Sequence, residues 1–517
     1  MRNAGQSRRS CLRPHDGDRD AGAARAEYSK GTGMDAIQSF GERNFGGVDL
    51  GDVRRTRRLV DAVDTMCRHP AGTLPDKLNQ PKMLRAFYRL VNREEVTHDV
   101  LIESHTDETR RRIAALGSAE NVAVTSEETS PSSSTATVLI LHDGTELDYT
   151  TLKALQKHLG QIGQGTRRGY IAHNSLAVRA DTGETLGLTS QILHHRAKRP
   201  KGETTKQSRE RANRESRLWL RGAEASGPAP AGVRCVDVSD TLSDTFEYMS
   251  YEVTQGRHFV LRAKENRKLD EAVVGEEYLF DAVRKLPSIG TCPLVVKASP
   301  GRKARETTVR VSFTKVRIAP PGEKLGEYEE TPLELWAVRV WEPNTPPGEE
   351  PLEWILLTNV AVETFTDACE RIEWYQKRWI VEEYHKGLKT GCGIETMQFD
   401  TIEALEPAIA VLSALATTLL ALRDAARAPD AETRPATEIV DPVYVEVLAA
   451  HYGKRLGTRP SVKAFYMHVA RLGGHQNRPC DGLPGWITLW RGWMKLQSMV
   501  DGYQAARPKT TSRCGKN

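Results

Sequence analysis

One stretch of the chain constrains its fold more than any other, because four polar side chains recur in it at helical steps. From Tyr375 the sequence reads YQKRWIVEEYHKGLK, in which Tyr375, Arg378, Glu382 and Lys389 are separated by three, four and seven residues. At about 100° per residue these side chains fall within an arc of roughly 60°. The pattern therefore predicts a helix that carries a carboxylate, two cations and a phenol on one stripe, which suits a metal ion and phosphates.

The same helix carries a separate apolar stripe that suits packing on a sheet, so the polar stripe is expected to be presented rather than buried. Gly391 is expected to end the helix. The alternative interpretation is an ordinary amphipathic helix whose charges face water. The apolar stripe consists of Trp374, Val381, Tyr384 and Leu388.

The spacing Y-x2-R-x3-E-x6-K resembles the signature of DDE transposases of the insertion sequence four family. Flanking residues of the family's pattern also match, namely Trp379, Glu383, His385, Lys386, Thr390 and Gly391. The resemblance covers about residues 42–506 and is weakest in the β-rich part. It implies an α/β fold with a ribonuclease H-like catalytic core and a β-rich insertion, flanked by helical N-terminal and C-terminal domains.

The resemblance also implies an activity and partners. A cut-and-paste DNA transposase binds the terminal inverted repeats of its element, hydrolyses one strand, forms and opens a DNA hairpin, and joins the 3′-OH ends to target DNA. The expected partners are double-stranded DNA, both element ends and target, and a second copy as a homodimer in the synaptic complex, without a membrane. Two alternatives stay open: a domesticated, catalytically impaired DNA-binding protein, and a Mg²⁺-dependent nuclease without strand transfer.

Composition agrees with a soluble protein, which is expected to stay in the cytoplasm, and the family resemblance implies that it associates with the bacterial nucleoid when bound to DNA. Charged residues make up 27% of the chain, the mean hydropathy is -0.51, and no apolar run is expected to approach the ~18 residues of a membrane span. The N-terminus lacks the apolar region of a signal peptide. The eight cysteines form no CxxC pair, which argues against a zinc site or a disulfide framework. A net charge of +5 is too balanced to indicate nucleic acid by itself.

The length of 517 residues suggests roughly three domains. Composition changes along the chain place their boundaries, and Met34 is an alternative start to Met1. We predict a disordered tail at 1–34, a helical DNA-end-binding domain at 35–115, a linker at 124–137, the DDE catalytic domain at 136–425 with its β-rich insertion at about 256–362, a helical dimerisation region at 440–506 and a basic tail at 507–517.

Strand and helix patterns alternate in the predicted catalytic domain. The apolar run at 137–143 and the segment at 233–238 predict strands, and 170–193 predicts a hairpin with its turn at 181–183. A helix is expected around 214–225, and five strands are expected within 256–362. This order fits an α/β core.

Cutting a phosphodiester requires an activated oxygen nucleophile and stabilisation of the leaving 3′ oxygen, which two divalent ions ~4 Å apart supply when hard oxygen ligands hold them. The family resemblance implies two Mg²⁺ ions per active site, with Mn²⁺ as a substitute, held by Asp143, Asp240 and Glu382. Asp143 ends the apolar run VLILH in a D-x-T context like that of the family's first aspartate. A turn-forming Asp before Gly is the alternative, and Asp148 is a weaker candidate because it lies past that turn.

The second acid is less clear from the residues alone. Aligning 244–247 with the end of the family's D-R-E-x-D-x-Y/F-E segment puts the catalytic aspartate at Asp240. The arginine and glutamate of that segment are replaced by Thr241 and Leu242. Asp237, on the strand itself, is the competing choice.

Several other residues are predicted to contact DNA. Arg378 suits a forked phosphate contact, Lys389 a point charge and Tyr375 a phenolic donor, while the family implies that Trp354 stacks on a flipped base. The segment LGDVRRTRRLV resembles the family's end-recognition segment. Further predicted phosphate contacts are His385, Lys386, Arg262, Lys264, Arg54, Arg55, Arg57 and Arg58, and the recurring Trp486, Trp490 and Trp493 are expected to combine a core role with pairing of two copies.

Overall fold

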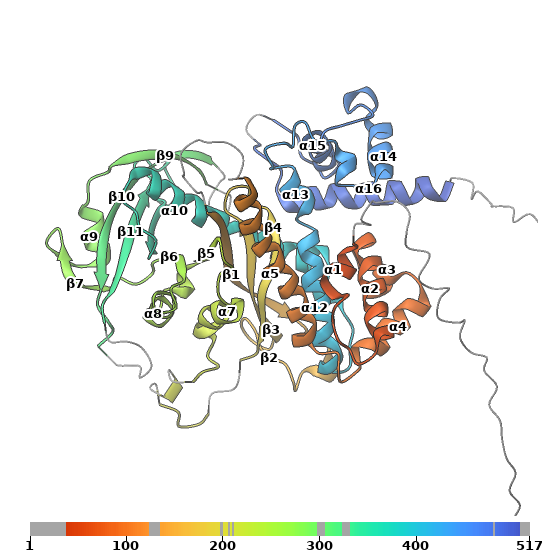
Figure 1. Cartoon of the computed structure of the whole chain (residues 1–517), viewed down its shortest axis with the longest axis horizontal. Helices are drawn as coiled ribbons and strands as arrows, with labels where there is room; N and C mark the ends of the chain where they lie inside the picture. Colours follow the sequence, from red (N-terminus) through yellow and green to blue (C-terminus); the bar gives the residue numbers. More distant parts are fainter. Residues whose placement is uncertain are drawn as a thin grey trace, which may run out of the picture. The chain divides into compact units, whose positions relative to one another are not determined.

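One large mixed sheet forms the centre of the protein (Figure 1). The computed structural model describes residues 38–123, 135–196, 200–204, 207–208, 211–296, 305–322, 331–478 and 481–506. The predictions for 1–34 and 507–517, and for most of 124–137, lie outside these residues. Within them the sheet has twelve strands in the order β2-β3-β1-β5-β6-β12-β11-β10-β7-β8, with β4 beside β3 and β9 beside β10.

The strands that surround the candidate site pair in two ways. β1 and β5 run parallel, as do β5 and β6, whereas β1, β3 and β4 are antiparallel neighbours. The strands are β1 (Ala136–Asp148), β2 (Gly160–Gln161), β3 (Arg168–Arg179), β4 (Thr185–His194), β5 (Val233–Ser239), β6 (His258–Arg262), β7 (Lys268–Val273), β8 (Glu276–Tyr278), β9 (Gly290–Val296), β10 (Arg305–Ile318), β11 (Leu333–Trp341) and β12 (Glu353–Thr358).

The helices flank this sheet on both faces and extend beyond it at the two ends of the described chain. They are α1 (Phe40–Phe45), α2 (Val53–Arg68), α3 (Leu74–Leu78), α4 (Pro81–Val91), α5 (His98–Ala123), α7 (Leu218–Ser226), α8 (Phe246–Thr254), α9 (Leu279–Lys285), α10 (Phe365–Lys377), α11 (Trp379–Lys386), α12 (Ile402–Thr418), α13 (Ala421–Ala425), α14 (Pro442–Tyr452), α15 (Val462–Leu472) and α16 (Trp486–Ala506).

The strand predictions are confirmed, with one correction at the first strand. The hairpin of β3 and β4 turns at 180–184, where Gly183 has a φ of 71°, and the five strands predicted in 256–362 are β6 and β9–β12. The turn expected at Asp143 and Gly144 is absent, because β1 continues to Asp148 by pairing with β3 after β5 has ended. The β-rich insertion also extends the same sheet and includes the unpredicted helix α9.

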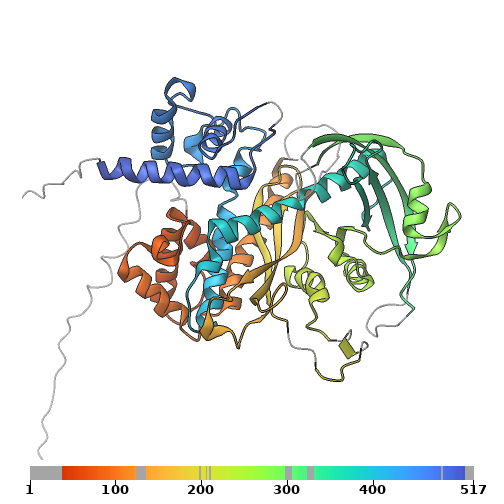
Figure 2. The ribbon, with the colours of Figure 1, turned by 180° about the vertical axis from the view of Figure 1, so that it is seen from behind.

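Two apolar layers hold helices to the two faces of the sheet. On one face α10, α11 and α12 pack against Leu139 and Leu141 of β1 and Val238 of β5. On the other face α7, α8 and α9 pack against strands that include β6, β11 and β12. Figure 2 shows α10 and α11 lying across the first face.

The predicted signature helix is interrupted. It begins with a capping box between Thr364 and Asp367, is divided at Arg378, and ends in a single π-turn at Gly387–Gly391. The apolar stripe is buried as predicted. The expectation of regular steps as far as Lys389 is wrong, because a π-turn adds a residue per turn and rotates the positions that follow it.

A C-terminal tryptophan packs on this π-turn. A Cβ atom at Gly391 would lie 3.0 Å from Trp486 Cη2 and 2.5 Å from Leu419 Cδ1. The indole Nε1 of Trp486 donates to the Leu419 carbonyl at 3.1 Å. Gly391 therefore leaves space that the first residue of α16 fills, whereas a Cβ at Gly387 would lie at an ordinary contact distance of 3.6 Å from Trp486 Cζ2.

The expectation that no apolar run reaches membrane-span length is also wrong. The segment Ile402–Ala425, which contains α12 and α13, is long and apolar enough by composition, since an 18-residue stretch within it has a mean hydropathy of 1.8. In the fold, 72% of that 18-residue stretch is buried, and α12 packs against α5, α4 and β4. A helix enclosed on several sides needs apolar residues around its whole circumference, which explains the composition.

Candidate catalytic site and nucleic-acid interface

Asp143 and Asp240 lie at matching positions of two parallel strands. The pairing of β1 with β5 runs from Ala136 opposite Val233 to Leu141 opposite Val238. Two residues further along each strand are Asp143 and Asp240, just beyond the last paired positions. The backbone there no longer forms a parallel ladder, which leaves both carboxyl groups at the edge where ligands bind in open α/β sheets.

Glu382 is linked to one of these aspartates, Asp143, through an arginine. Arg378 Nη2 donates to Glu382 Oε1 at 2.7 Å, and Arg378 Nη1 lies 3.4 Å from Asp143 Oδ2. The side chains of Asp143 and Glu382 are 17% and 28% exposed. The carboxylates of β1 and α11 are thus reachable by solvent while a guanidinium lies between them.

The carboxyl groups of this cluster hold their protons more tightly than usual. Burial raises the pKa of Asp143 against the effect of Arg378. Burial and then the neighbouring charge of Asp143 raise the pKa of Asp240, and burial raises that of Glu382, with Asp143 adding to the effect. Crowded carboxylates of this kind are typical of functional sites.

The donor set fits a hard divalent cation in its chemistry. Asp143, Asp240 and Glu382 offer only carboxylate oxygens, the ligands that Mg²⁺ prefers, and a cation would relieve their mutual repulsion. In the described part of the chain, however, no three His, Cys, Asp or Glu side chains converge closely enough to hold a metal ion. Arg378 takes the place of a cation in this arrangement.

The competing aspartate, Asp237, faces the other way. Its carboxylate accepts from His142 Nε2 at 2.6 Å and from Arg257 Nη2 at 2.7 Å, and its side chain is 1% exposed. Asp240 comes three positions later, in extended backbone just past the end of β5, so the two side chains point to opposite faces of the sheet. Asp148, the weaker candidate, ends β1 in a contact of 3.0 Å with Arg167 Nε.

Asp240 also has a structural role. Its side chain accepts from Leu242 N at 3.0 Å and caps the short turn Thr241–Ser243. Asp244 accepts from the backbone of Lys264 and Glu265, while Thr245 caps α8.

Tyr375 and Trp354 form an aromatic wall beside the carboxylates. Their ring centroids are 5.2 Å apart in an edge-to-face arrangement. Tyr375 is buried, and burial raises the pKa of its phenol. Arg262 donates to the Glu353 carbonyl at 3.1 Å, and Lys264 is exposed nearby in sequence.

The last residues of the signature segment have different surroundings. Lys389 Nζ lies 3.4 Å from Glu395 Oε1, an acid that the sequence analysis did not single out. His385 is buried, and its Nδ1 lies 4.0 Å from Asp143 Oδ2, so it faces the carboxylates rather than the surface. The ammonium of Lys386 lies over the Trp379 ring.

The four predicted arginines of α2 divide into two kinds. Arg54 pairs with Asp52 at 2.8 Å, and Arg55 pairs with Glu95 at 2.9 Å while donating to the Leu50 carbonyl. Arg57 and Arg58 are exposed.

Arg58 contributes to a basic pocket of about 260 Å³ between α2 and α4. Besides Ala86 it is lined by Arg58, Lys82, Arg85 and Arg89, and no carboxylate is among the described residues that line it. A concave group of four cations suits phosphate oxygens. Lys82 and Arg85 were not predicted. Their spacing from Arg89, in steps of three and four residues, indicates one face of a helix and could have been used to predict them.

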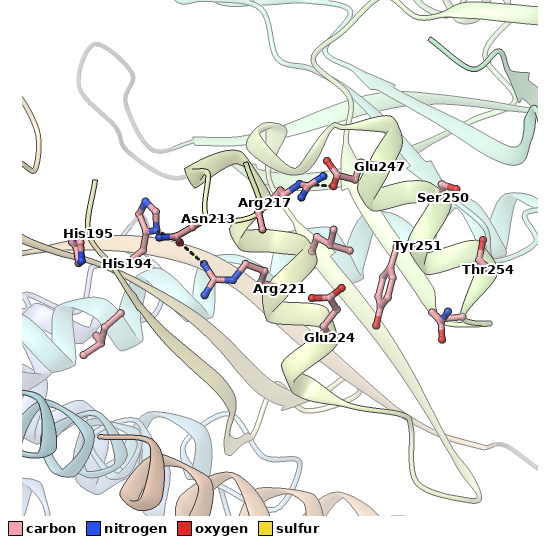
Figure 3. A pocket seen from close by; sticks show the side chains of 14 residues that line it. His194, His195, Asn213, Arg217, Arg221, Glu224, Glu247, Ser250, Tyr251 and Thr254 are labelled. Carbon is pink, nitrogen blue, oxygen red and sulfur yellow. Dashed lines mark hydrogen bonds and ion pairs between the residues drawn. The ribbon is translucent and has the colours of Figure 1, made fainter. Parts of the chain in front are cut away.

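A larger cavity of about 790 Å³ lies on the opposite face of the sheet, beside α7 and α8 (Figure 3). Its polar groups mostly bond one another: Arg217 Nε lies 2.6 Å from Glu247 Oε1, and Arg221 donates to Asn213 at 3.1 Å. It shares no residue with the carboxylate cluster.

A comparison with known protein families adds independent evidence at the N-terminal helices. Residues 37–96, which include α1–α4 and the basic pocket, match a family model described as transposase DNA-binding. The match supports a transposase that binds DNA, and therefore a DNA partner.

Proposed function

We propose that this protein is a cut-and-paste DNA transposase of the DDE type, with a ribonuclease H-like catalytic core. The observation that carries the proposal is the contact of Arg378 with both Asp143 and Glu382, with Asp240 at the matching end of the neighbouring parallel strand, in a chain whose N-terminal helices match a transposase DNA-binding model. Each carboxylate comes from a separate element, and together they supply the oxygen ligands that phosphodiester cleavage requires.

The three carboxylates would hold Mg²⁺, two ions per site, with Mn²⁺ as a substitute. When bound, the ions would activate the attacking oxygen and stabilise the leaving 3′ oxygen. Arg378 would release Asp143 and Glu382 and turn its fork to a phosphate, for which its planar guanidinium is suited. Lys389 and Tyr375 would position the phosphates next to the cleaved bond, with Trp354 beside them for a flipped base.

The N-terminal helices would hold the element end. Arg57 and the basic pocket of Arg58, Lys82, Arg85 and Arg89 present cations without a carboxylate among the lining residues, so each is available to a phosphate. Arg54 and Arg55 are held by Asp52 and Glu95 and would contribute less. Two copies would pair two ends in the synaptic complex before cleavage, hairpin formation and joining to target DNA.

The decisive experiment compares Glu382→Gln with the unchanged protein on a duplex that carries the inverted repeat bordering the gene. Loss of Mg²⁺-dependent cleavage with normal end binding is expected, because the substitution removes the carboxylate while the side chain keeps nearly the same shape. Glu373→Gln is the matched control, since Glu373 is exposed on α10. Appreciable residual cleavage by Glu382→Gln would contradict the assignment.

The same assay separates the rival functions. The ion pairs of Arg378 favour one of them, a DNA-binding protein that has lost catalysis, because they already neutralise two of the carboxylates. That protein would bind the repeat without cutting it in Mg²⁺ or Mn²⁺. A nuclease without strand transfer would cut the repeat but fail to join a precut end to a supercoiled target.

A further inference from the structure

A row of polar side chains crosses the sheet beside the candidate catalytic carboxylates. Asp143 of β1 is paired with Asn174 of β3, and Asn174 is paired with Gln191 of β4. Directly paired residues of neighbouring strands point to the same face, so the three side chains form one line. Asn174 is 0% and Gln191 is 6% exposed. Buried amide side chains in strands need hydrogen-bond partners, because each buried donor or acceptor without one lowers the stability by about 1–3 kcal/mol.

Hydrogen bonds connect this row to three helices. Asn174 Nδ2 lies 3.1 Å from His385 Nε2 on α11. Gln191 Nε2 donates to Asn174 Oδ1 at 2.7 Å and to Ser413 Oγ of α12 at 2.9 Å. Gln191 Oε1 lies 3.1 Å from His98 Nε2 at the start of α5. Every polar atom of the two amide groups therefore has a partner.

The backbone fixes the direction of these bonds. Asn174 Nδ2 also lies 3.3 Å from the Ala172 carbonyl, which can only accept, so the amide nitrogen rather than the oxygen must lie on that side. The same nitrogen then donates to His385 Nε2, which is left as the bare ring nitrogen. A neutral imidazole of this kind carries its proton on Nδ1, the atom that lies 4.0 Å from Asp143 Oδ2.

We propose that Asn174, supported by Gln191, acts as a positioning residue that holds His385 with its Nδ1–H directed at Asp143 and so keeps that carboxylate in place. A movement of about 1 Å would bring the two atoms to hydrogen-bond distance. The catalytic part of this inference rests on the proposed DNA cleavage, whereas the orientation of His385 does not.

The far end of the row lies close to the DNA-binding helices. His98 follows the segment 37–96 that matches transposase DNA-binding domains, and its Nδ1 lies 3.0 Å from the exposed Asp99 carboxylate. A continuous line of polar contacts thus runs from the first turn of α5 to Asp143. Its role is the orientation of side chains along this line, with no proton transfer through it.

The test begins with the unchanged protein, free of DNA and metal. Long-range proton–nitrogen NMR of protein labelled with ¹⁵N-histidine distinguishes the two neutral tautomers, and His385→Gln identifies the His385 signals. A protonated Nδ1 with a bare Nε2 is expected. A protonated Nε2 would overturn the proposal, whatever any variant does.

Asn174→Leu tests whether the Asn174 amide sets the tautomer of His385, because leucine has a similar volume but no hydrogen-bond donor. The His385 signals should shift toward the Nε2–H form, and an unchanged tautomer in folded protein would overturn the proposal. Thr189→Val is the matched control, since Thr189 is buried on β4 and its hydroxyl bonds Ser175 and Ser226 rather than the amide row. It should leave the His385 tautomer unchanged even if it lowers the unfolding temperature.

Cleavage measurements complete the test. In Asn174→Leu the rate of cleavage should fall about 10- to 100-fold, the usual range for a group that orients a metal ligand from outside, while the Kd for end DNA and the cleavage rate of Thr189→Val stay unchanged. Equal loss in both variants would reduce Asn174 to a structural role. If Glu382→Gln still cleaves, the proposed function fails, and the NMR result still decides the tautomer.

Discussion

Two arginines each bridge a pair of carboxylates, on opposite faces of the same sheet, and their surroundings differ. Arg257 contacts Asp237 and Glu252, whose side chains are 1% and 0% exposed. Arg378 contacts Asp143 and Glu382, which are 17% and 28% exposed. The carboxylates of the first group, one of them on α8, are buried, whereas solvent reaches those of the second group. An arginine between two carboxylates therefore has a structural role where solvent is excluded. Where solvent reaches the carboxylates, as at Arg378, they remain accessible to a ligand.

The pKa directions of the aspartates agree with this difference, whereas burial and the charge of Asp237 raise the pKa of Glu252 in the closed group. Burial alone would raise the pKa of Asp237, but Arg257 and His142 overcome it and hold the pKa below its ordinary value. In the open group, the pKa values of Asp143, Asp240 and Glu382 are all raised. The surroundings of Asp237 therefore stabilise its ionised form. Ionisation of the carboxyl groups in the open group instead lowers the stability of the folded protein.

The largest expected effect is on cleavage. Asp143→Asn and Asp240→Asn should each reduce it by about two to three orders of magnitude, the scale of losing one charged group at a reacting centre. Asp237→Asn should reduce it much less once rates are divided by the folded fraction from circular dichroism. The reverse ranking would move the second acid to Asp237 and break the comparison.

The next effect is on stability. Arg257→Met should lower the free energy of unfolding by about 3–5 kcal/mol, because it removes the cation between two buried carboxylates and leaves only the contact of His142 beside Asp237. Arg378→Met, the same exchange in the open group, should cost clearly less, since water can solvate Asp143 and Glu382. Urea unfolding measures both, and equal losses would show that the two groups are equally closed.

A similar contrast between engaged and available cations occurs in α2. Arg58→Ala should lower the slope of log K against log salt for end DNA by about 0.9, the contribution of one phosphate contact. Arg54→Ala should change it little, because Arg54 already pairs with Asp52. Fluorescence anisotropy over a range of salt concentrations measures the slopes, and equal changes would mean that the Asp52 contact does not withhold Arg54 from DNA.

The smallest expected effect concerns pH. Because the pKa of Asp240 is raised in the folded state, the folded protein binds that proton more tightly than the unfolded chain, and stability falls as pH rises from about 4 through the raised pKa. Asp240→Asn removes this penalty and should raise the unfolding temperature by about 1–2 °C at neutral pH, with no gain below pH 4. An Asp237→Asn variant should show the opposite sign, and its loss should fade in acid.

Apolar runs were enough to predict the long buried strands and the buried stripe of α10 and α11, but not the short strands β2, β7 and β8. They could not predict that β1 continues past Asp143, because the strand that extends it, β3, pairs from a distance in sequence. Trp486, from the distant α16, packs on the π-turn at Gly387–Gly391, and the partner of Lys389 is Glu395. Contacts of this kind follow from the tertiary fold rather than from local propensity.

The candidate site was readable in part. Spacing on one helix suggested that Arg378 and Glu382 meet, and they do. The sequence alone did not say which of Asp240 and Asp237 points to the same face of the sheet as Asp143. That required the alternation of side chains along β5. Asn174 and Gln191 interrupt apolar strands and could have been noticed for that reason, but their shared row is visible only once the register of β1, β3 and β4 is known.

The packing of Trp486 has a consequence for how the protein is made. A growing chain folds from its N-terminus, so the DNA-binding helices are complete long before the ribosome adds Trp486 near the end of the 517 residues. Until then the helix that carries Glu382 lacks the indole that supports its π-turn. A chain that ends before Trp486 therefore lacks the side chain that packs on the π-turn next to Glu382.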